Sequence, residues 1–309
     1  MTKALAIYLG GKCNLNCKYC HRENNELETG VSNKLLNYIK EHKIDRIAFF
    51  GGEPTLYMDD IKKVVEANPM ADFKITTNGV GIKKYLPFFY SHKFLVCISY
   101  DGNNELRGYD PFQEVINYPW LAVSCSLYHG NTDFKAIIKK FAEKEKIVGR
   151  HLPFYPHIIH YTSEKNKAYR LTDDDYAYIF EQYKEFVSKY VYDYVNYGVM
   201  NVRYNGLFNQ LRDRYYARYW FGETYCVNGR LLKCNANGDF FSCLYIRDQK
   251  PSELRGYIKK NFPKCVNCPV YSMCGSACIK SLDHEAECRY YYKLYSWFKW
   301  FFYLYKGKF

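Results

Sequence analysis

The sequence predicts an α/β protein, a partial (β/α)6 barrel of the TIM type, followed by a cysteine-rich carboxyl-terminal extension. Between residues 4 and 155, short apolar runs alternate with amphipathic stretches, which is typical of a parallel sheet with crossover helices. Six such units suit an incomplete barrel better than a full eight-stranded one. Polar and glycine-rich segments follow four of the runs directly, where a parallel barrel places its functional site.

The individual elements are predicted from the spacing of apolar residues. The predicted strands cover residues 4–9, 46–50, 73–77, 94–99, 120–127 and 147–155. Helical spacing fills most of the gaps, as in Leu35, Leu36 and Ile39, then Ile61, Val64 and Val65, then Ile137, Ile138 and Phe141. A second helical region covers residues 161–221, with a start signal at Thr172, where a capping residue precedes an acidic first turn.

Composition restricts the class of protein. The chain has 309 residues, 48% of them hydrophobic, which is ample for a substantial core. No signal peptide and no uncharged apolar run long enough to span a bilayer is recognisable, so we expect a cytoplasmic protein. Thirteen cysteines in a reducing compartment point to metal binding rather than disulfides. The formal charge of +12 is spread along the chain without a dense basic block, so dedicated nucleic-acid binding is not favoured.

A three-cysteine loop follows the first predicted strand. Cys13, Cys17 and Cys20 have the spacing C-x3-C-x2-C. Three thiolates so close in sequence can hold three corners of an iron-sulfur cube and leave its fourth iron open to a substrate or cofactor, whereas electron carriers close all four positions. The alternative is a zinc knuckle in which His21 supplies the fourth ligand.

Glycine and polar residues follow the next three strands. These segments are Gly51-Gly52-Glu53-Pro54, Thr76-Thr77-Asn78-Gly79 and Ser99-Tyr100-Asp101-Gly102. Glycines let the backbone approach a ligand closely, and the exposed backbone groups can then bind an amino group or a carboxylate. Each segment alone could be an ordinary turn, but all of them follow strands in the same way as the cysteine loop.

The cysteine loop, with Tyr19 before its last cysteine, and the Gly51-to-Pro54 turn together resemble the radical S-adenosylmethionine (radical SAM) enzymes. The resemblance implies that Cys13, Cys17 and Cys20 carry a 4Fe-4S cluster whose free iron binds the methionine part of SAM. It also implies cofactor contacts, with the amino group bound by Gly51, Gly52, Glu53 and Pro54, the adenine near Tyr19, and the ribose or carboxylate near Asn78, Ser99 and Asp101.

A second cysteine region lies between residues 226 and 288. Its eight thiols are Cys226, Cys234, Cys243, Cys265, Cys268, Cys274, Cys278 and Cys288. They are enough to close two cubes, and the C-x2-C-x5-C-x3-C run departs from the usual zinc ribbon. Two cysteines remain, Cys97 and Cys125, and both fall within predicted strands, where we expect buried, inert thiols.

This spacing is similar to the SPASM domain, the two-cluster extension of many radical SAM enzymes. The resemblance implies interleaved ligand sets, one of Cys226, Cys234, Cys243 and Cys278, the other of Cys265, Cys268, Cys274 and Cys288. Metal loss should then unfold the region. In sulfatase-maturing members an Asp follows the cysteine that matches Cys243. Here that position is Leu244, which cannot accept a proton, so formylglycine formation is not expected.

The last residues are unusually aromatic. On a helical wheel Tyr291, Leu294, Phe298, Phe301, Phe302 and Tyr305 share one face, and Arg289, Lys293 and Ser296 share the other. This pattern favours packing against the barrel or a second subunit over a membrane-surface helix. The expected organisation is a radical SAM partial barrel at 1–160, a bridging helical segment at 161–225, a SPASM domain at 226–288 and an aromatic helix at 289–309.

The resemblance implies reductive cleavage of SAM to a 5′-deoxyadenosyl radical, which removes hydrogen from a peptide or protein side chain and leads to an oxidative modification such as a thioether or carbon-carbon crosslink. The implied cofactors are SAM and three 4Fe-4S clusters, and flavodoxin or ferredoxin is an expected electron donor. We expect no amino-terminal leader-binding domain, so a separate leader-peptide-binding protein is a further candidate partner. The alternatives are a small-molecule substrate, a zinc-binding scaffold and a multi-cluster electron carrier. The substrate, general base and oligomeric state are not predictable from the sequence.

Overall fold

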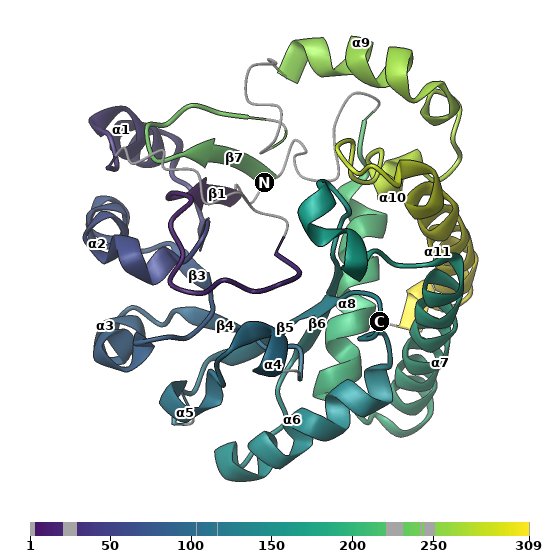
Figure 1. Ribbon diagram of the computed structural model, residues 1–309, viewed down its shortest axis with the longest axis horizontal. Coiled ribbons are helices and arrows are strands. Elements are labelled where there is room, and N and C mark those ends of the chain that lie inside the picture. The colour runs from purple at the N-terminus through teal and green to yellow at the C-terminus, as the bar shows by residue number, and fades with distance from the viewer. Residues whose placement is uncertain are drawn as a thin grey trace.

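The computed structural model describes residues 4–20, 30–102, 104–115, 117–220, 231–241, 243 and 251–308. Its centre is one parallel sheet with the strand order β6-β5-β4-β3-β2-β1-β7. The strands are β1 (Ala4–Tyr8), β2 (Arg46–Phe50), β3 (Asp72–Thr77), β4 (Leu95–Ser99), β5 (Leu121–Leu127), β6 (Phe154–Ile158) and β7 (Leu231–Asn235). They form an open arc, with helices on its outer side (Figure 1).

The helices that follow the strands cover the outer side of this arc, as expected for crossover connections. They are α1 (Asn33–His42), α2 (Met58–Ala67), α3 (Leu86–Ser91), α4 (Asn104–Arg107), α5 (Phe112–Val115) and α6 (Phe134–Val148), with the 3-10 turns η1 (Pro54–Tyr57) and η2 (Ile82–Tyr85). Their apolar residues form a buried core with the strands, including Leu35, Ile61, Ile137 and Phe141. The predicted partial barrel is therefore confirmed as a seven-stranded half-barrel.

The strands differ from the prediction in two places. Residues 147–148 belong to the end of α6, because the helical spacing of Ile137 and Phe141 continues to Val148 and Gly149 then caps the helix with φ +69°. The sixth strand therefore begins only at Phe154. The seventh strand, β7, was not predicted. It comes from the cysteine-rich region and pairs with β1 in parallel, for example Ile7 with Cys234.

The second helical region forms two long helices, α7 (Asp173–Tyr197) and α8 (Val202–Ala217), after the turn η3 (Glu164–Tyr169). The predicted start of α7 is confirmed, since the Thr172 side chain accepts from the backbone N–H of Asp175, whose carboxylate accepts from the backbone N–H of Thr172. The remaining elements are α9 (Pro251–Asn261), η4 (Pro263–Cys265), α10 (Tyr271–Cys274), α11 (His284–Tyr305) and η5 (Lys306–Lys308).

The helix α11 packs its predicted apolar face against α7 and α8. Leu294, Phe298, Phe301 and Phe302 are buried in the same core as the sheet, and the Phe208 ring of α8 lies 6.1 Å from that of Phe298. The opposite face carries exposed Arg289 and Lys293. Within the described residues, none of the helices combines the length and apolar character that a bilayer crossing requires.

Candidate functional site

The cysteine loop lies inside the arc of strands, directly after β1 (Figure 1). Cys13, Cys17 and Cys20 are all half-buried. The loop is bonded to the turn after β2, since the Gly52 N–H donates to the Gly10 carbonyl at 2.8 Å and the Glu53 N–H donates to the Lys12 carbonyl at 2.8 Å. The two segments that the sequence singles out thus form one unit at the carboxyl edge of the sheet.

The close approach of these segments explains the glycines of the turn. A Cβ atom on Gly52 would lie 2.2 Å from the Lys12 carbonyl oxygen and 2.4 Å from that of Gly11. A Cβ atom on Gly51 would lie 2.6 Å from the Gly10 carbonyl oxygen. Only glycine allows the turn to cross the cysteine loop at this distance.

The Glu53 side chain is bound by the protein itself. It is fully buried, and its Oε1 accepts from the Thr55 N–H and from the hydroxyls of Thr55 and Thr77, at 2.7 to 3.0 Å. Its Oε2 accepts from the Asn78 N–H at 2.7 Å. The carboxylate therefore joins the ends of β2 and β3, and contacts from this turn to a ligand amino group would come from backbone carbonyls. Pro54 begins η1 behind it.

Asn78 connects the end of β3 to the cysteine loop. Its Nδ2 donates to the Asn14 side chain at 2.7 Å and lies 3.6 Å from Cys13 Sγ. The Leu15 N–H also points at this sulfur, at 3.4 Å. Burial raises the pKa of the Cys13 and Cys17 thiols, so these groups become thiolates when a metal replaces the proton.

Tyr19 and Asp101 are buried together with Arg107, a residue that sequence reasoning missed. The Arg107 guanidinium donates to the Tyr19 hydroxyl at 2.9 Å, and that hydroxyl is also hydrogen-bonded to Asp101. The Tyr19 ring stacks on Tyr128 with centroids 4.7 Å apart. Arg107 and Tyr128 thus hold a side chain of the cysteine loop in place. Ser99 is the last residue of β4. No motif marks Arg107, which stands alone between Leu106 and Gly108.

This arrangement fits the cluster and cofactor that the sequence predicts. The donor set is three thiols on one loop, and the glycine turn lies directly against that loop. His21, which the zinc alternative requires, lies outside the described residues. Within the described parts of the chain, no group of three or more His, Cys, Asp or Glu side chains converges as closely as a single metal ion requires.

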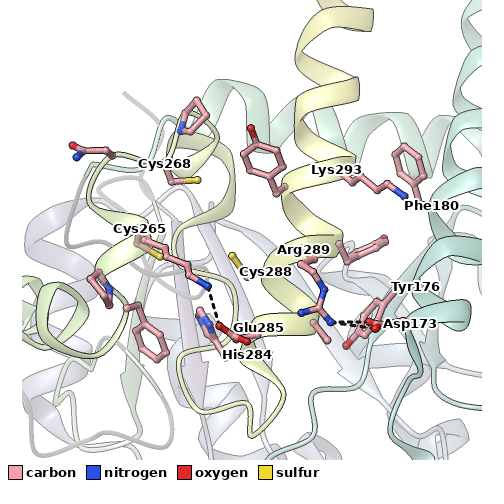
Figure 2. Close-up of a pocket in the computed structure, with 18 of the residues that line it drawn as sticks. Asp173, Tyr176, Phe180, Cys265, Cys268, His284, Glu285, Cys288, Arg289 and Lys293 are labelled. Carbon is pink, nitrogen blue, oxygen red and sulfur yellow. Dashed lines mark hydrogen bonds and ion pairs between the residues drawn. The ribbon is translucent and has the colours of Figure 1, made fainter.

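Four cysteines of the second region surround one small cavity. Cys265, Cys268, Cys274 and Cys288 line it, and they come from η4, the following turn, α10 and α11. Burial, together with the neighbouring Cys288 and Cys268, raises the pKa of Cys265 to about 11. Three of these residues, Cys265, Cys268 and Cys288, also edge a larger cavity of about 920 Å³ between α7 and α11 (Figure 2).

The other predicted ligand set is described only in part. Cys226 lies outside the described residues, as does Leu244. Cys234 is buried in β7, where burial and the charge of Asp239 raise its pKa to about 12. Cys243 is buried and Cys278 is half-buried. Cys97 in β4 and Cys125 in β5 are buried as predicted.

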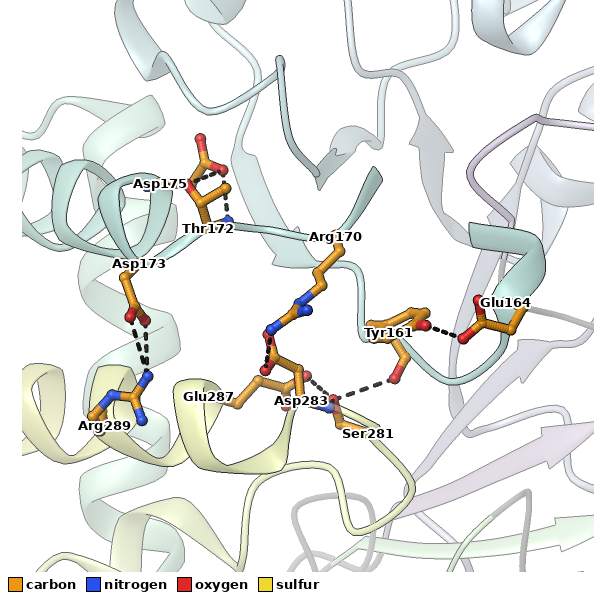
Figure 3. A network of polar contacts seen from close by, with 10 residues as sticks. All are labelled: Tyr161, Glu164, Arg170, Thr172, Asp173, Asp175, Ser281, Asp283, Glu287 and Arg289. Carbon is orange, nitrogen blue, oxygen red and sulfur yellow. Dashed lines mark hydrogen bonds and ion pairs between the residues drawn. The ribbon is translucent and has the colours of Figure 1, made fainter. Parts of the chain in front are cut away.

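A polar network joins the end of the half-barrel to the start of α11 (Figure 3). Arg170 binds Asp283 through two hydrogen bonds of 2.8 and 2.9 Å. The fully buried Glu287 accepts from the Ser281 hydroxyl and lies 2.9 Å from His160 Nδ1. Because Glu287 precedes Cys288, the network fixes the position of one of the four cavity thiols. His160 is thus engaged in this network, while His151 contacts Glu145 and His157 lies on β6.

The His160–Glu287 pair gives a testable pH dependence. Burial lowers the pKa of His160, but the charge of Glu287 and the hydrogen bond to it outweigh burial and raise that pKa above its usual value. The contribution of the His160–Glu287 pair to the free energy of unfolding is therefore complete below about pH 6.5, the pKa of an unfolded histidine. It is lost as the pH rises through the pKa of His160 in the folded protein. We expect His160→Gln to lower the free energy of unfolding more at pH 6 than at pH 9, as measured by urea unfolding.

His92→Gln is the matched control, because His92 contacts Ser91 and the Phe88 carbonyl rather than a carboxylate. Its effect on the free energy of unfolding should be equal at both pH values. An equal loss for His160→Gln at pH 6 and pH 9 would contradict the proposed charged pair.

The first half of the chain matches a known protein family. Residues 7–148 match the family model of the Radical SAM superfamily. This region is similar to radical SAM domains. Its match includes the cysteine loop, the Gly51-to-Pro54 turn and the ends of β3 and β4, and radical SAM domains bind SAM and a 4Fe-4S cluster.

Curated relatives of the radical SAM domain are similar over a limited stretch. The protein called "Probable GTP 3′,8-cyclase" of Methanococcus aeolicus is 35% identical over 95 residues, which are 27% of this chain and 31% of the relative. That of Methanothermobacter thermautotrophicus is 37% identical over 90 residues, covering 26% and 29%. The chain thus spans less than a third of the length of these relatives.

Solved structures are similar over nearly the whole chain. Native anSMEcpe with bound AdoMet superposes with a TM-score of 0.65 and 20% identity over 97% of this chain and 98% of that chain. Streptococcus suis SuiB bound to its precursor peptide SuiA superposes with a TM-score of 0.60 and 18% identity over 91% and 72%. At these identities the likeness establishes a shared fold, the half-barrel with its carboxyl-terminal extension.

Proposed function

We propose that this protein reductively cleaves SAM and uses the resulting 5′-deoxyadenosyl radical to remove a hydrogen atom from a peptide or protein side chain. The product would be an oxidative modification such as a thioether or carbon-carbon crosslink. The observation that carries the proposal is the unit of three half-buried thiols and a glycine turn inside a radical SAM domain.

The residues of this unit have distinct proposed roles. Cys13, Cys17 and Cys20 would hold a 4Fe-4S cluster, and bound SAM on that cluster supplies the radical chemistry. Asn78 hydrogen-bonds the loop beside Cys13 and orients it. Gly51 and Gly52 let the turn lie directly against the cysteine loop, and Glu53 holds the turn that they form. The stacked Tyr19 and Tyr128 rings keep water away from the loop's inner side.

We also propose that the carboxyl-terminal extension is a SPASM domain with two closed clusters. The shared cavity supports Cys265, Cys268, Cys274 and Cys288 as one ligand set, and Cys226, Cys234, Cys243 and Cys278 would form the other. A fully ligated cluster does not bind substrate, so its proposed role is to accept the electron that an oxidative modification releases.

The cavity set can be tested separately from the loop. We expect the double variant Cys268→Ala, Cys288→Ala to contain about four irons fewer than the wild type, because a cube with two protein ligands is not retained. Cleavage of SAM with a chemical reductant should persist, since the loop is unchanged. Cys125→Ala is the control and should keep all of its iron. An iron content equal to that of the wild type would exclude this ligand set.

Two kinds of substrate are supported by different comparisons. Peptide substrates are supported by the fold, because the similar structures include anSMEcpe with bound AdoMet and Cp18Cys peptide and SuiB bound to SuiA. A small-molecule substrate, in particular a nucleotide, is supported by the probable GTP 3′,8-cyclases that resemble the radical SAM domain. The peptide is the leading proposal because those similarities extend over the extension as well as the domain.

Anaerobic reconstitution tests the proposal. The expected result is about twelve irons per chain and 5′-deoxyadenosine after reduction. Zinc without iron would indicate a scaffold, and iron without 5′-deoxyadenosine would indicate an electron carrier. Mass spectrometry of candidate peptides and of GTP, each incubated with the reduced protein, then separates the two substrate classes. A flavodoxin or ferredoxin and a separate leader-peptide-binding protein are the proposed partners to add.

A further inference from the structure

The carboxyl-terminal half of α11 has a second apolar face that the core does not cover. Trp300, Tyr303 and Leu304 are 62%, 65% and 52% exposed. Their spacing of three and four residues places them side by side on the helix. We call these three residues the outer face of α11. Single exposed apolar residues are normal on proteins, but three large ones together on a helix whose other face is buried are unusual.

The outer face continues onto neighbouring elements. Tyr216 of α8 is 46% exposed, and its ring lies 5.7 Å from that of Phe302 on α11. A groove of about 400 Å³ runs beside Trp300 and Tyr303 and is lined by Tyr215, Pro269, Val270 and Lys299. The apolar surface therefore extends across α11 and α8 rather than ending at one helix.

Positive charge flanks the outer face of α11. Glu287 is the last acidic side chain in the sequence, and residues 288–309 contain Arg289, Lys293, Lys299, Lys306 and Lys308 without any Asp or Glu. Arg289 is paired with Asp173 of α7. Lys299 and Lys306 flank the outer face directly, and the Lys306 ammonium lies 4.7 Å from the centre of the Tyr303 ring. Aromatic rings and cations are thus interleaved on the same side of the molecule.

We propose that the outer face of α11 docks onto an anionic lipid surface. Tryptophan and tyrosine favour the boundary between water and hydrocarbon, leucine favours insertion, and lysines are attracted to acidic headgroups. Because charge and a few inserted side chains suffice for reversible lipid binding, the attachment is peripheral. This inference does not depend on the proposed reaction.

The test uses the full-length protein and vesicles of two compositions. We expect the wild type to sediment with phosphatidylcholine vesicles that contain phosphatidylserine and to stay in solution with phosphatidylcholine alone. Binding should weaken as salt is raised, because the lysine contribution is screened. Each lysine near such a surface contributes about fivefold in affinity. The triple variant Lys299→Gln, Lys306→Gln, Lys308→Gln should therefore bind about a hundredfold more weakly.

Matched controls carry the same substitutions elsewhere. Lys40→Gln, Lys62→Gln and Lys63→Gln remove three exposed lysines from α1 and α2 and should leave binding unchanged. Trp300→Ser, Tyr303→Ser and Leu304→Ser should abolish binding, whereas Met70→Ser and Tyr90→Ser, at residues that are also exposed, should not. Circular dichroism confirms that each variant is folded.

Three outcomes would overturn the proposal. The first is no sedimentation with the anionic vesicles, and the second is equal sedimentation with both compositions. The third is a dimer in solution that the Trp300, Tyr303 and Leu304 variant dissociates while vesicles have no effect, which would show that a second copy of the chain covers the outer face.

Discussion

Replacing Cys13, Cys17 and Cys20 together by alanine is expected to abolish 5′-deoxyadenosine formation. The three thiols are half-buried on one loop, which runs inside the arc of strands (Figure 1), and no cluster remains at that position without them. The iron content of the reconstituted protein should fall by about four per chain, because the cysteines of the second region stay in place. Both quantities can be measured on one preparation, by iron analysis and by chromatography of the reduced mixture with SAM.

Cys97→Ala is the control for the triple variant. Cys97 is buried in β4, so its loss removes a thiol without touching the loop. Iron and 5′-deoxyadenosine should both match the wild type. If the triple variant still formed 5′-deoxyadenosine, the loop would not be the site of SAM cleavage and the proposed function would be wrong.

The elements that the sequence predicts correctly are those that a pattern of neighbouring apolar residues marks. β2 begins and ends where the apolar run predicts, and β1, β3, β4 and β5 differ by one residue. The strand β7 could not be found in this way, because Leu231–Asn235 is short and its place beside β1 depends on pairing with a segment more than two hundred residues earlier. No pattern within residues 231–235 alone shows this pairing.

The same distinction holds within the candidate site. The spacing of Cys13, Cys17 and Cys20 and the glycines of the turn are readable because the sequence keeps them together. The partners of Glu53 are not readable, since Thr77 and Asn78 become its donors only when β3 lies beside β2. Arg107 likewise acquires its role from Tyr19, eighty-eight positions away. Sequence thus predicts which segments form the site, and the fold decides which side chains are free to contact a ligand.

The contact between the glycine turn and the cysteine loop leads to the second prediction with a large effect. We expect Gly52→Ala to lower 5′-deoxyadenosine formation by at least about a hundredfold, since misplacing a reacting group by about 1 Å can cost that much. The new Cβ atom would lie 2.2 Å from the Lys12 carbonyl oxygen. That neighbour is backbone, so the cysteine loop itself must move and its thiols move with it.

Gly256→Ala is the matched control for Gly52→Ala. Gly256 lies within α9, and no heavy atom would come within 4 Å of its added Cβ atom. The same substitution there should keep the activity and stabilise the helix by roughly 0.5–1 kcal/mol. Circular dichroism and thermal melting separate a local shift of the loop from unfolding, because the hydrogen bonds within the sheet do not involve Gly52. Wild-type iron content and activity in folded Gly52→Ala would show that the cluster does not need the loop in this position, and the roles assigned to the turn would then have to be abandoned.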